Sequence, residues 1–145
     1  MTLFERIVIA TDGSKTSKFA VIEGLRIGKA CNSSISVVSV IDTRALSSVS
    51  PEIQVQRSID QMQREAEGIV SDAKALGEGQ NIETFILNGD PVNEITKFSS
   101  SRAADLIVVG TQGKHGLEKF FLGSVAEGVV RQAPCPVLVV KNYAP

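Results

Sequence analysis

The hydrophobic positions of this chain alternate between short runs rich in β-branched residues and longer stretches with helical spacing. Five short runs predict β-strands, because Val and Ile side chains fit the pleated surface of a sheet: residues 3–10, 35–41, 82–87, 106–109 and 137–140. The fourth and fifth runs are almost unbroken in their apolar character, as expected of parallel strands that are covered on both faces. The pattern therefore predicts a parallel sheet between layers of helices.

Four longer stretches between these runs predict helices, over about residues 14–30, 51–76, 91–101 and 123–133. The third has a clear start, because Asp90-Pro91 combines an N-cap with a proline at the first helical position. The second has apolar side chains at steps of three and four, which we interpret as its core face: Ile59, Met62, Ala66, Ile69, Ala73 and Leu76.

The alternation of strands and helices predicts an α/β fold with a parallel sheet. Right-handed crossovers leave few arrangements for five strands. If the first two crossovers wind one way and the third returns past the first strand, the result is an open, Rossmann-like sheet of order 3-2-1-4-5 with helices on both faces. Ligands bind such sheets outside the carboxyl ends of the strands where the winding reverses, so we expect a site just after Ala10 and Val109.

Composition agrees with this fold and narrows the range of partners. The chain has 145 residues, 43% hydrophobic and 21% charged, with a formal net charge of −1, which predicts a single globular domain over residues 1–145. The balanced charge argues against a large basic surface for nucleic acid or for an anionic membrane. We find no signal peptide and no membrane-spanning run, and we interpret Cys31 and Cys135 as reduced thiols, so we expect a cytoplasmic protein.

Glycine-rich segments follow the first and fourth predicted strands, where the fold places the site. After the fourth strand, glycines permit positive φ and close approach of backbone amides to a phosphate at positions Gly110, Gly113 and Gly116. The helix that begins at Gly123-Ser124 adds unpaired amides, and Lys114 and Lys119 add positive charge. Asp12 has the wrong charge for a phosphate, and it suits nucleoside hydroxyls or a divalent ion. The two segments together predict a nucleotide-like ligand.

The glycine spacing also resembles a known family. Gly110, two residues, Gly113, nine residues and Gly123-Ser124 are similar to the G-x2-G-x9-G-[ST] signature of the ATP-binding universal stress proteins. The resemblance extends over the chain, from the opening Ile-Val-Ile-Ala-Thr-Asp-Gly-Ser to the closing Ala-Pro-Cys-Pro-Val-Leu-Val-Val. It implies a 3-2-1-4-5 sheet, a homodimer, and ATP or another adenine nucleotide in the crevice. Magnesium is a reasonable companion to ATP, although no carboxylate cluster demands it.

The resemblance also implies roles for individual residues. The nucleoside end would be formed by Ala10, Thr11 and Asp12, and the backbone of Val40, or of Ile41 if the alignment shifts by one, would bind adenine. The ribose and phosphates would lie against Gly110, Thr111, Gln112, Gly113, Gly123, Ser124 and Val125. Gln112 stands where many relatives have His or Arg, and Ala126 where some have a hydroxyl. Both differences remove a possible phosphate contact.

Three functions remain open at this point. The leading one is a nucleotide-binding regulatory protein without efficient chemistry, because no base, nucleophile or arginine finger is identifiable. A slow ATPase or self-phosphorylating enzyme would use Asp12, Ser124 or His115, and we interpret His115 as an exposed loop residue. A dimeric interaction protein that needs no nucleotide is the third. A phospho-acceptor receiver domain fits poorly, because only Asp12 of its acidic residues is present.

Two further segments have expected roles. The apolar run 137–140 is predicted at the edge of the sheet, where pairing with a second copy would cover it, in agreement with the dimer that the resemblance implies. Residues 42–51 contain three serines, and we expect this loop to form a lid over the adenine side of the site.

Overall fold

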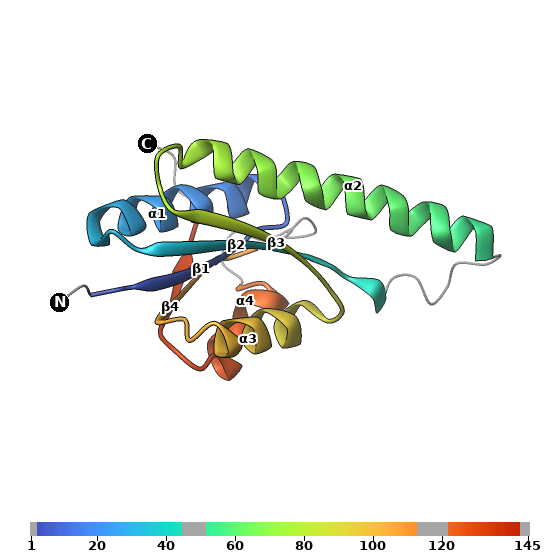
Figure 1. Cartoon of the computed structure of the whole chain (residues 1–145). Coiled ribbons are helices and arrows are strands. Elements are labelled where there is room, and N and C mark those ends of the chain that lie inside the picture. Colours follow the sequence, from blue (N-terminus) through green and yellow to red (C-terminus); the bar gives the residue numbers. More distant parts are fainter. Residues whose placement is uncertain (1–2, 45–51, 113–121, 143–145) are drawn as a thin grey trace.

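A computed structural model describes residues 3–44, 52–112 and 122–142. Of residues 52–55 only the backbone is described. Figure 1 shows the chain as a sheet between two layers of helices. The elements in chain order are β1 (Arg6–Ala10), α1 (Lys15–Cys31), β2 (Ser34–Ile41), α2 (Glu52–Leu76), β3 (Ile82–Asn88), α3 (Pro91–Ser101), β4 (Leu106–Gly110), α4 (Ser124–Gln132) and β5 (Val137–Val140).

The sheet has five strands in the order β3-β2-β1-β4-β5, and every neighbouring pair is parallel. Helices α1 and α2 cover one face, and α3 and α4 cover the other (Figure 1). This arrangement confirms the predicted fold class and strand order. The winding reverses between β1 and β4, so the ends of these two strands lie side by side although they are about a hundred residues apart in sequence.

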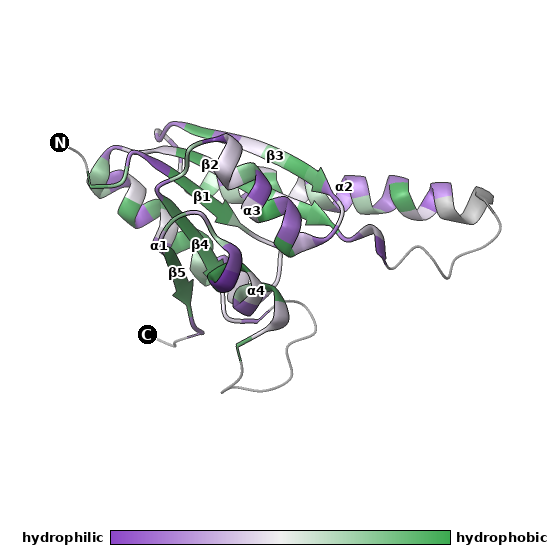
Figure 2. Cartoon of the chain, turned by 90° about the horizontal axis from the view of Figure 1, so that it is seen from below, coloured by the Kyte–Doolittle hydropathy of each residue, from purple (hydrophilic) through white to green (hydrophobic). Residues whose placement is uncertain are grey.

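The central strands are apolar because both of their faces are buried. Ile7, Val8 and Ile9 of β1 are almost completely inaccessible. Ile7 and Ile9 pack with α1 and α2, whereas Val8 between them packs with α3 and α4, following the two-residue alternation of a strand. Figure 2 shows the same apolar character along β1, β4 and β5. The expectation that the unbroken apolar runs are covered on both faces is confirmed for β4, where residues 106–109 are all buried, and only in part for β5, where Val140 alone is buried.

Two sequence expectations about boundaries and burial were wrong. The first strand begins at Arg6 and not at residue 3, because Leu3 is 77% exposed and the Asp105 carboxylate accepts the amides of Glu5 and Arg6 where the strand starts. The α2 stripe is only partly a core face: Ala66 and Ala73 are buried, but Leu76 at the end of the helix is half exposed.

Among the described residues, no helix is long and apolar enough to span a membrane.

Strand β5 lies at one edge of the sheet, as expected. It pairs with β4 on one side, and within the described part of the chain no strand pairs with its other side. Val137, Leu138 and Val139 are half buried, and only Val140 is fully buried. An apolar edge strand with one unpaired side is a surface on which a further strand can add.

Candidate functional site

A hollow of about 560 Å³ lies at the carboxyl ends of the strands, where the fold predicts a ligand site. We call it the carboxyl-end hollow. Of the residues predicted for the nucleotide, all but Gly113 line it: Ala10, Thr11, Asp12, Val40, Gly110, Thr111, Gln112, Gly123, Ser124 and Val125. Gly113 lies outside the described residues, as do Lys114, His115, Gly116, Lys119 and most of the proposed lid, residues 45–51.

The loop between β1 and α1 is held in place by side-chain hydroxyls. The Ser17 hydroxyl donates to the Ser14 carbonyl at 3.0 Å, so its oxygen, 2.9 Å from Thr11 Oγ1, accepts the proton of Thr11. Thr11 Oγ1 in turn accepts the amide of Gly13 at 3.2 Å. Thr11 is only 7% exposed, so its side chain mainly builds the loop. The loop holds Asp12 at the hollow, where Asp12 Oδ1 accepts the amide of Ser14 at 2.9 Å.

The backbone of Val40 faces the carboxyl-end hollow. The Val38 carbonyl accepts the Thr11 amide on the β1 side, and the Ile41 carbonyl accepts the Gly89 amide on the β3 side. Because the amide and carbonyl of one residue point to the same side of a strand and successive residues alternate, Val40 points in the same direction as Val38. Pairing of β1 with β2 ends at Ala10 and Val38, so nothing in β1 pairs with Val40. The alternation favours Val40 over Ile41 for a backbone contact with a ligand.

The first turn of α4 opens into the hollow without a side-chain cap. Its N-cap is Gly123, with φ −62° and ψ 159°, and no side chain accepts its first amides at that position. The other caps described differ, since Ser14 accepts an amide at the start of α1 and Asp90 at the start of α3. Thr111 positions the α4 turn, because its carbonyl accepts the Gly123 amide while its own amide donates to Val140. The helix end thus offers amide donors and a positive dipole to a ligand.

Close packing, and not backbone conformation, accounts for the glycine at position 110. Gly110, one of the three positions where glycine permits a positive φ, does not have one, and the other two, Gly113 and Gly116, lie outside the described residues. A Cβ on Gly110 would lie 3.2 Å from the Thr16 carbonyl oxygen and 3.3 Å from Ser17 Cα. Gly110 is therefore small because the first turn of α1 crosses β4 at this point. In the loop between β1 and α1, Gly13 has a positive φ of +80° and packs against Ile69.

Sequence reasoning missed an apolar slot at the Val40 end of the hollow. Its residues come from one face of α2 and from the first turns of α3: Met62, Ala66, Ile69, Pro91 and Ile95. The stripe on α2 pointed to these positions, but it was interpreted as core alone. The slot lies between helices on opposite sides of the sheet, beyond the end of β2, and its lining suits a weakly polar group.

An ion-pair network links the residues that follow β2 to the residue that begins α3. Arg44 donates from Nε and Nη2 to the two carboxylate oxygens of Asp42, at 2.9 and 2.7 Å, and its Nη1 lies 2.7 Å from Asp90 Oδ1. The hydrogen bonds from Arg44 hold the pKa of the Asp42 carboxyl below its usual value of 3.8, against the opposing effect of partial burial. The same pairing raises the pKa of Arg44, so both groups stay charged.

A model of the universal stress protein family matches residues 3–141, which include every element and both segments of the site. The chain belongs to the universal stress protein family. Universal stress protein MJ0531 of Methanocaldococcus jannaschii is 39% identical over 142 residues, which cover 97% of this chain and 84% of that protein.

Solved structures of relatives extend the likeness to the fold. A universal stress protein crystallised in complex with cAMP is 30% identical, with a TM-score of 0.65 over 94% of this chain and 96% of its own. A universal stress protein from Archaeoglobus fulgidus in complex with dAMP has a TM-score of 0.70 over 97% of this chain and 100% of its own. At 21% identity the second likeness establishes the fold alone.

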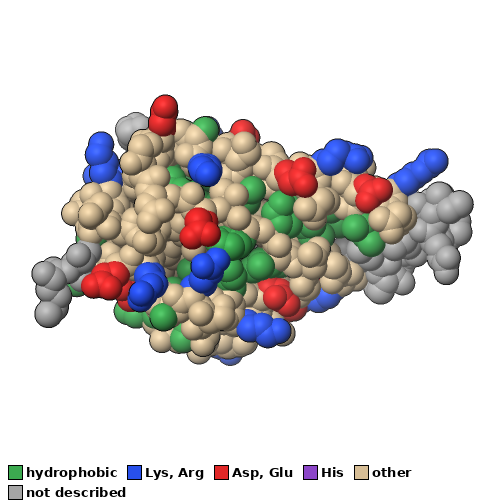
Figure 3. Space-filling view, viewed as in Figure 1, with side chains coloured by type: hydrophobic (Ala, Val, Ile, Leu, Met, Phe, Trp, Pro, Cys, Tyr) green, Lys and Arg blue, Asp and Glu red, His purple; other side chains and the backbone are tan. Residues whose placement is uncertain are grey.

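The charges of this universal stress protein are mixed around the hollow. The described lining residues include the carboxylates of Asp12, Asp42 and Glu65 and the guanidinium of Arg44. On the face seen in Figure 3, acidic and basic side chains are interspersed and neither sign gathers in one place. In the described part of the chain, no group of three or more His, Cys, Asp or Glu side chains is placed to hold a metal ion.

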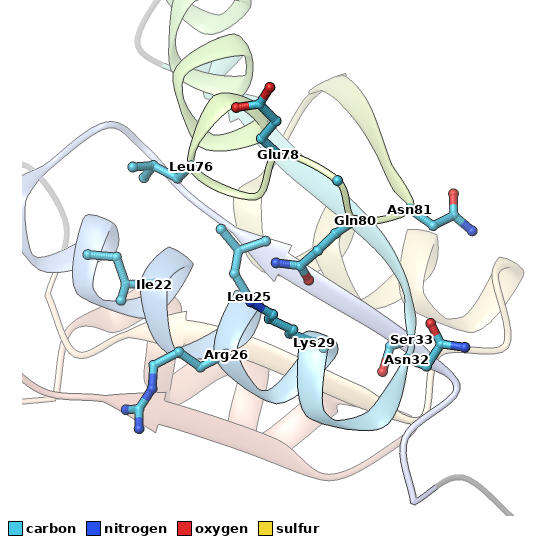
Figure 4. A pocket seen from close by; sticks show the side chains of 12 residues that line it. Ile22, Leu25, Arg26, Lys29, Asn32, Ser33, Leu76, Glu78, Gln80 and Asn81 are labelled. Carbon is cyan, nitrogen blue, oxygen red and sulfur yellow. The ribbon is translucent and has the colours of Figure 1, made fainter.

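A second hollow, of about 570 Å³, lies at the opposite end of the sheet, and we call it the amino-end hollow. Figure 4 shows apolar side chains of α1 and α2 on one side of it, Ile22, Leu25 and Leu76, and the amides of Asn32 and Asn81 on the other. The helix ends that meet here are carboxyl ends, which present carbonyl oxygens instead of amides. None of the residues predicted for the nucleotide lines this hollow.

The two cysteines are free thiols, and neither lines either hollow. Cys31 ends α1 and Cys135 precedes β5, and both are half buried. Burial, with a smaller contribution from the Asp105 carboxylate, raises the pKa of the Cys135 thiol. A raised pKa keeps the thiol protonated and therefore a poor nucleophile at neutral pH.

Proposed function

We propose that this universal stress protein binds ATP or another adenine nucleotide in the carboxyl-end hollow and acts as a regulatory protein of the ATP-binding subgroup, in a single domain over residues 1–145. The observation that carries the proposal is that residues 10–12, 40, 110–112 and 123–125, chosen from the sequence, line one hollow at the reversal of the sheet. The relatives solved with cAMP and dAMP support an adenine nucleotide as the ligand class.

The adenine base fits the apolar slot. A base buries mostly apolar surface and needs hydrogen bonds at its edge, and the slot offers both. Ile69 of α2 and Ile95 of α3 approach from opposite sides, and the backbone amide and carbonyl of Val40 lie at the floor. A floor that supplies a donor and an acceptor together suits the edge of a base, which carries both.

The ribose and phosphates occupy the rest of the hollow in this proposal. Asp12 accepts hydrogen bonds from ribose hydroxyls, because its carboxylate lines the hollow beside β1. The phosphates lie against the uncapped first turn of α4, where the amides that follow Gly123 and the Ser124 hydroxyl supply donors. Magnesium would screen the phosphates from the acidic lining, and the described residues assign no protein ligand to it.

Calorimetry with ATP, AMP and cAMP, each with and without magnesium, tests the proposal. We expect binding of at least one of the three in the micromolar to millimolar range, and no binding at millimolar concentration contradicts the proposal. Asp12→Ala should weaken binding. Glu78→Ala is the matched control, because Glu78 is an exposed carboxylate at the amino-end hollow.

We also propose that the protein is a homodimer that pairs through β5. The support is the position of Val137–Val140 at the sheet edge with one side unpaired among the described residues. Sedimentation equilibrium should give about twice the 15.4 kDa mass of the chain. A single species at the monomer mass, at micromolar concentration, would show that this edge is covered in another way.

A further inference from the structure

Arg44 connects two elements that form different parts of the carboxyl-end hollow. Asp42, to which it is bound in a fork, follows β2 directly, and Asp90 is the N-cap of α3. All three guanidinium nitrogens are used, a geometry that lysine cannot reproduce. Asp90 has a second task, because its other oxygen, Oδ2, accepts the amide of Asn93 at 3.0 Å. The network therefore fastens the start of α3 to the end of β2.

The fastening matters because α3 is one wall of the apolar slot. Pro91 and Ile95 lie in the first turns of α3, immediately after Asp90, and both line the hollow. On the sheet side, a backbone hydrogen bond from the Gly89 amide to the Ile41 carbonyl, 3.0 Å long, holds the same corner. Core packing of Ile95 with Val38 holds α3 against the sheet, and at the corner where α3 begins its position relative to β2 also depends on this backbone bond and on the Arg44 network.

We propose that Arg44 is a positioning residue for the nucleotide base, because its bridge between Asp42 and Asp90 fixes the width of the slot. The inference rests on the proposed function and goes beyond it, since the bridge acts through Pro91 and Ile95 and not through a contact with phosphate. Arg44 is 63% exposed, and exposed ion pairs contribute little to global stability. Its loss should therefore change binding more than unfolding.

Two single variants separate positioning from simple charge. Arg44→Gln removes a positive charge, whereas Asp90→Asn removes a negative charge and keeps the helix cap, because Asn caps as well as Asp. If charge alone mattered, the two variants would change the affinity for an anionic nucleotide in opposite directions. If the bridge positions the wall, both variants weaken binding, and the double variant is no weaker than the worse single one.

The experiment is calorimetry of wild type, Arg44→Gln, Asp90→Asn and the double variant, with whichever of ATP, AMP and cAMP wild type binds most tightly. We expect both single variants to bind about threefold to tenfold more weakly. The control is Arg26→Gln, which breaks a pair of the same length, 2.7 Å to Glu23, at the amino end, and should bind like wild type. Thermal unfolding verifies that each variant is folded.

The outcomes distinguish this inference from the proposed function. If wild type binds none of the three nucleotides, the proposed function and this inference are both overturned. If wild type binds and Arg44→Gln binds equally well, only the inference is overturned. Tighter binding by Asp90→Asn, together with weaker binding by Arg44→Gln, would also overturn it, because that pattern reports charge and not position.

Discussion

The two ends of the sheet have hollows of nearly equal volume, about 560 Å³ at the carboxyl end and about 570 Å³ at the amino end, but their backbones differ. At the amino end, α1 closes on itself: Asn32 adopts a left-handed conformation with φ 53°, and its amide donates to the carbonyls of Gly28 and Lys29. The Ser33 amide also donates to the Gly28 carbonyl. At the carboxyl end, α4 begins at Gly123, and no side chain accepts a hydrogen bond from the first amides of that helix.

The difference shows that volume alone does not make a binding site. The amino-end hollow is lined by polar groups that already serve the fold, as when the Asn81 side-chain amide donates to Ser34 Oγ and the Ser33 hydroxyl donates to the Phe4 carbonyl. The carboxyl-end hollow combines an apolar slot with backbone donors that a ligand can satisfy, and unsatisfied donors are costly to bury without one. Variants at the two ends can test this contrast directly.

The largest effect is expected from giving α4 the cap that it lacks. In Gly123→Asp, the introduced carboxylate would accept the first amides of the helix, and the extended backbone at this position suits any N-cap residue. Nucleotide affinity should fall about tenfold or more, because the carboxylate competes with phosphate for the same donors and repels it. Stability should rise by roughly 0.3 kcal/mol. Calorimetry and urea unfolding measure the two quantities.

Gly123→Ala is the control, because it adds a side chain at the same position without an acceptor. It should keep most of the affinity. Equal losses in the two variants would mean that the position tolerates no side chain, and the amides of α4 would then lose their assigned role.

A matched pair of hydroxyl variants at the two ends has the next largest effect. Thr11→Val removes the hydrogen bonds of Thr11 to Ser17 and Gly13, and Ser33→Ala removes the bond to Phe4 at the amino end. Each buried hydroxyl should contribute about 1 kcal/mol to the free energy of unfolding, measured in urea. Only Thr11→Val should also weaken nucleotide binding, because Thr11 holds the loop that presents Asp12. Weaker binding by Ser33→Ala would remove the contrast between the ends.

The fold was predictable from the sequence because two signals identify its strands, the apolar runs and the Gly or Pro residues that bound them. Residues 106–109 and 137–140 are apolar throughout, and the Gly and Pro residues around them set their limits, so strand type and order followed from pattern and handedness. The start of β1 was not predictable in this way, because Leu3 is apolar and yet exposed. An apolar residue at the end of a run has no pattern beyond it to show which way it faces.

The site was predictable only where a backbone role requires a distinctive residue type such as glycine. Gly110 and Gly123 stood out as glycines, although the structure gives Gly110 a packing reason that no spacing reveals. Ile69 and Ile95 line the slot, but an isoleucine at a ligand site and one in a core have the same periodicity. Arg44 pairs with Asp90, 46 positions further along the chain, through a contact that only the folded sheet creates.

A smaller effect at the carboxyl end follows from the titration of Asp42. Its folded-state pKa lies below the ordinary value of 3.8, so the stabilisation from its pair with Arg44 is complete above that value and is lost as the pH falls through the lowered one. The difference in urea midpoint between wild type and Asp42→Asn should therefore be present at neutral pH and shrink as the pH falls below 3.8. A difference that grows on acidification would contradict the sign of the shift.

The smallest effect is expected at the amino-end hollow. Leu76 is 50% exposed there and lies beside Ile22 and Leu25, so Leu76→Ser removes apolar surface of which half is in water already (Figure 4). The free energy of unfolding should change by less than about 0.5 kcal/mol. Nucleotide affinity should not change, because the residue lies at the end of α2 opposite to the slot residues Met62 and Ala66. A loss of affinity in calorimetry would mean that the two hollows communicate along α2, and the separation of the two ends would have to be abandoned.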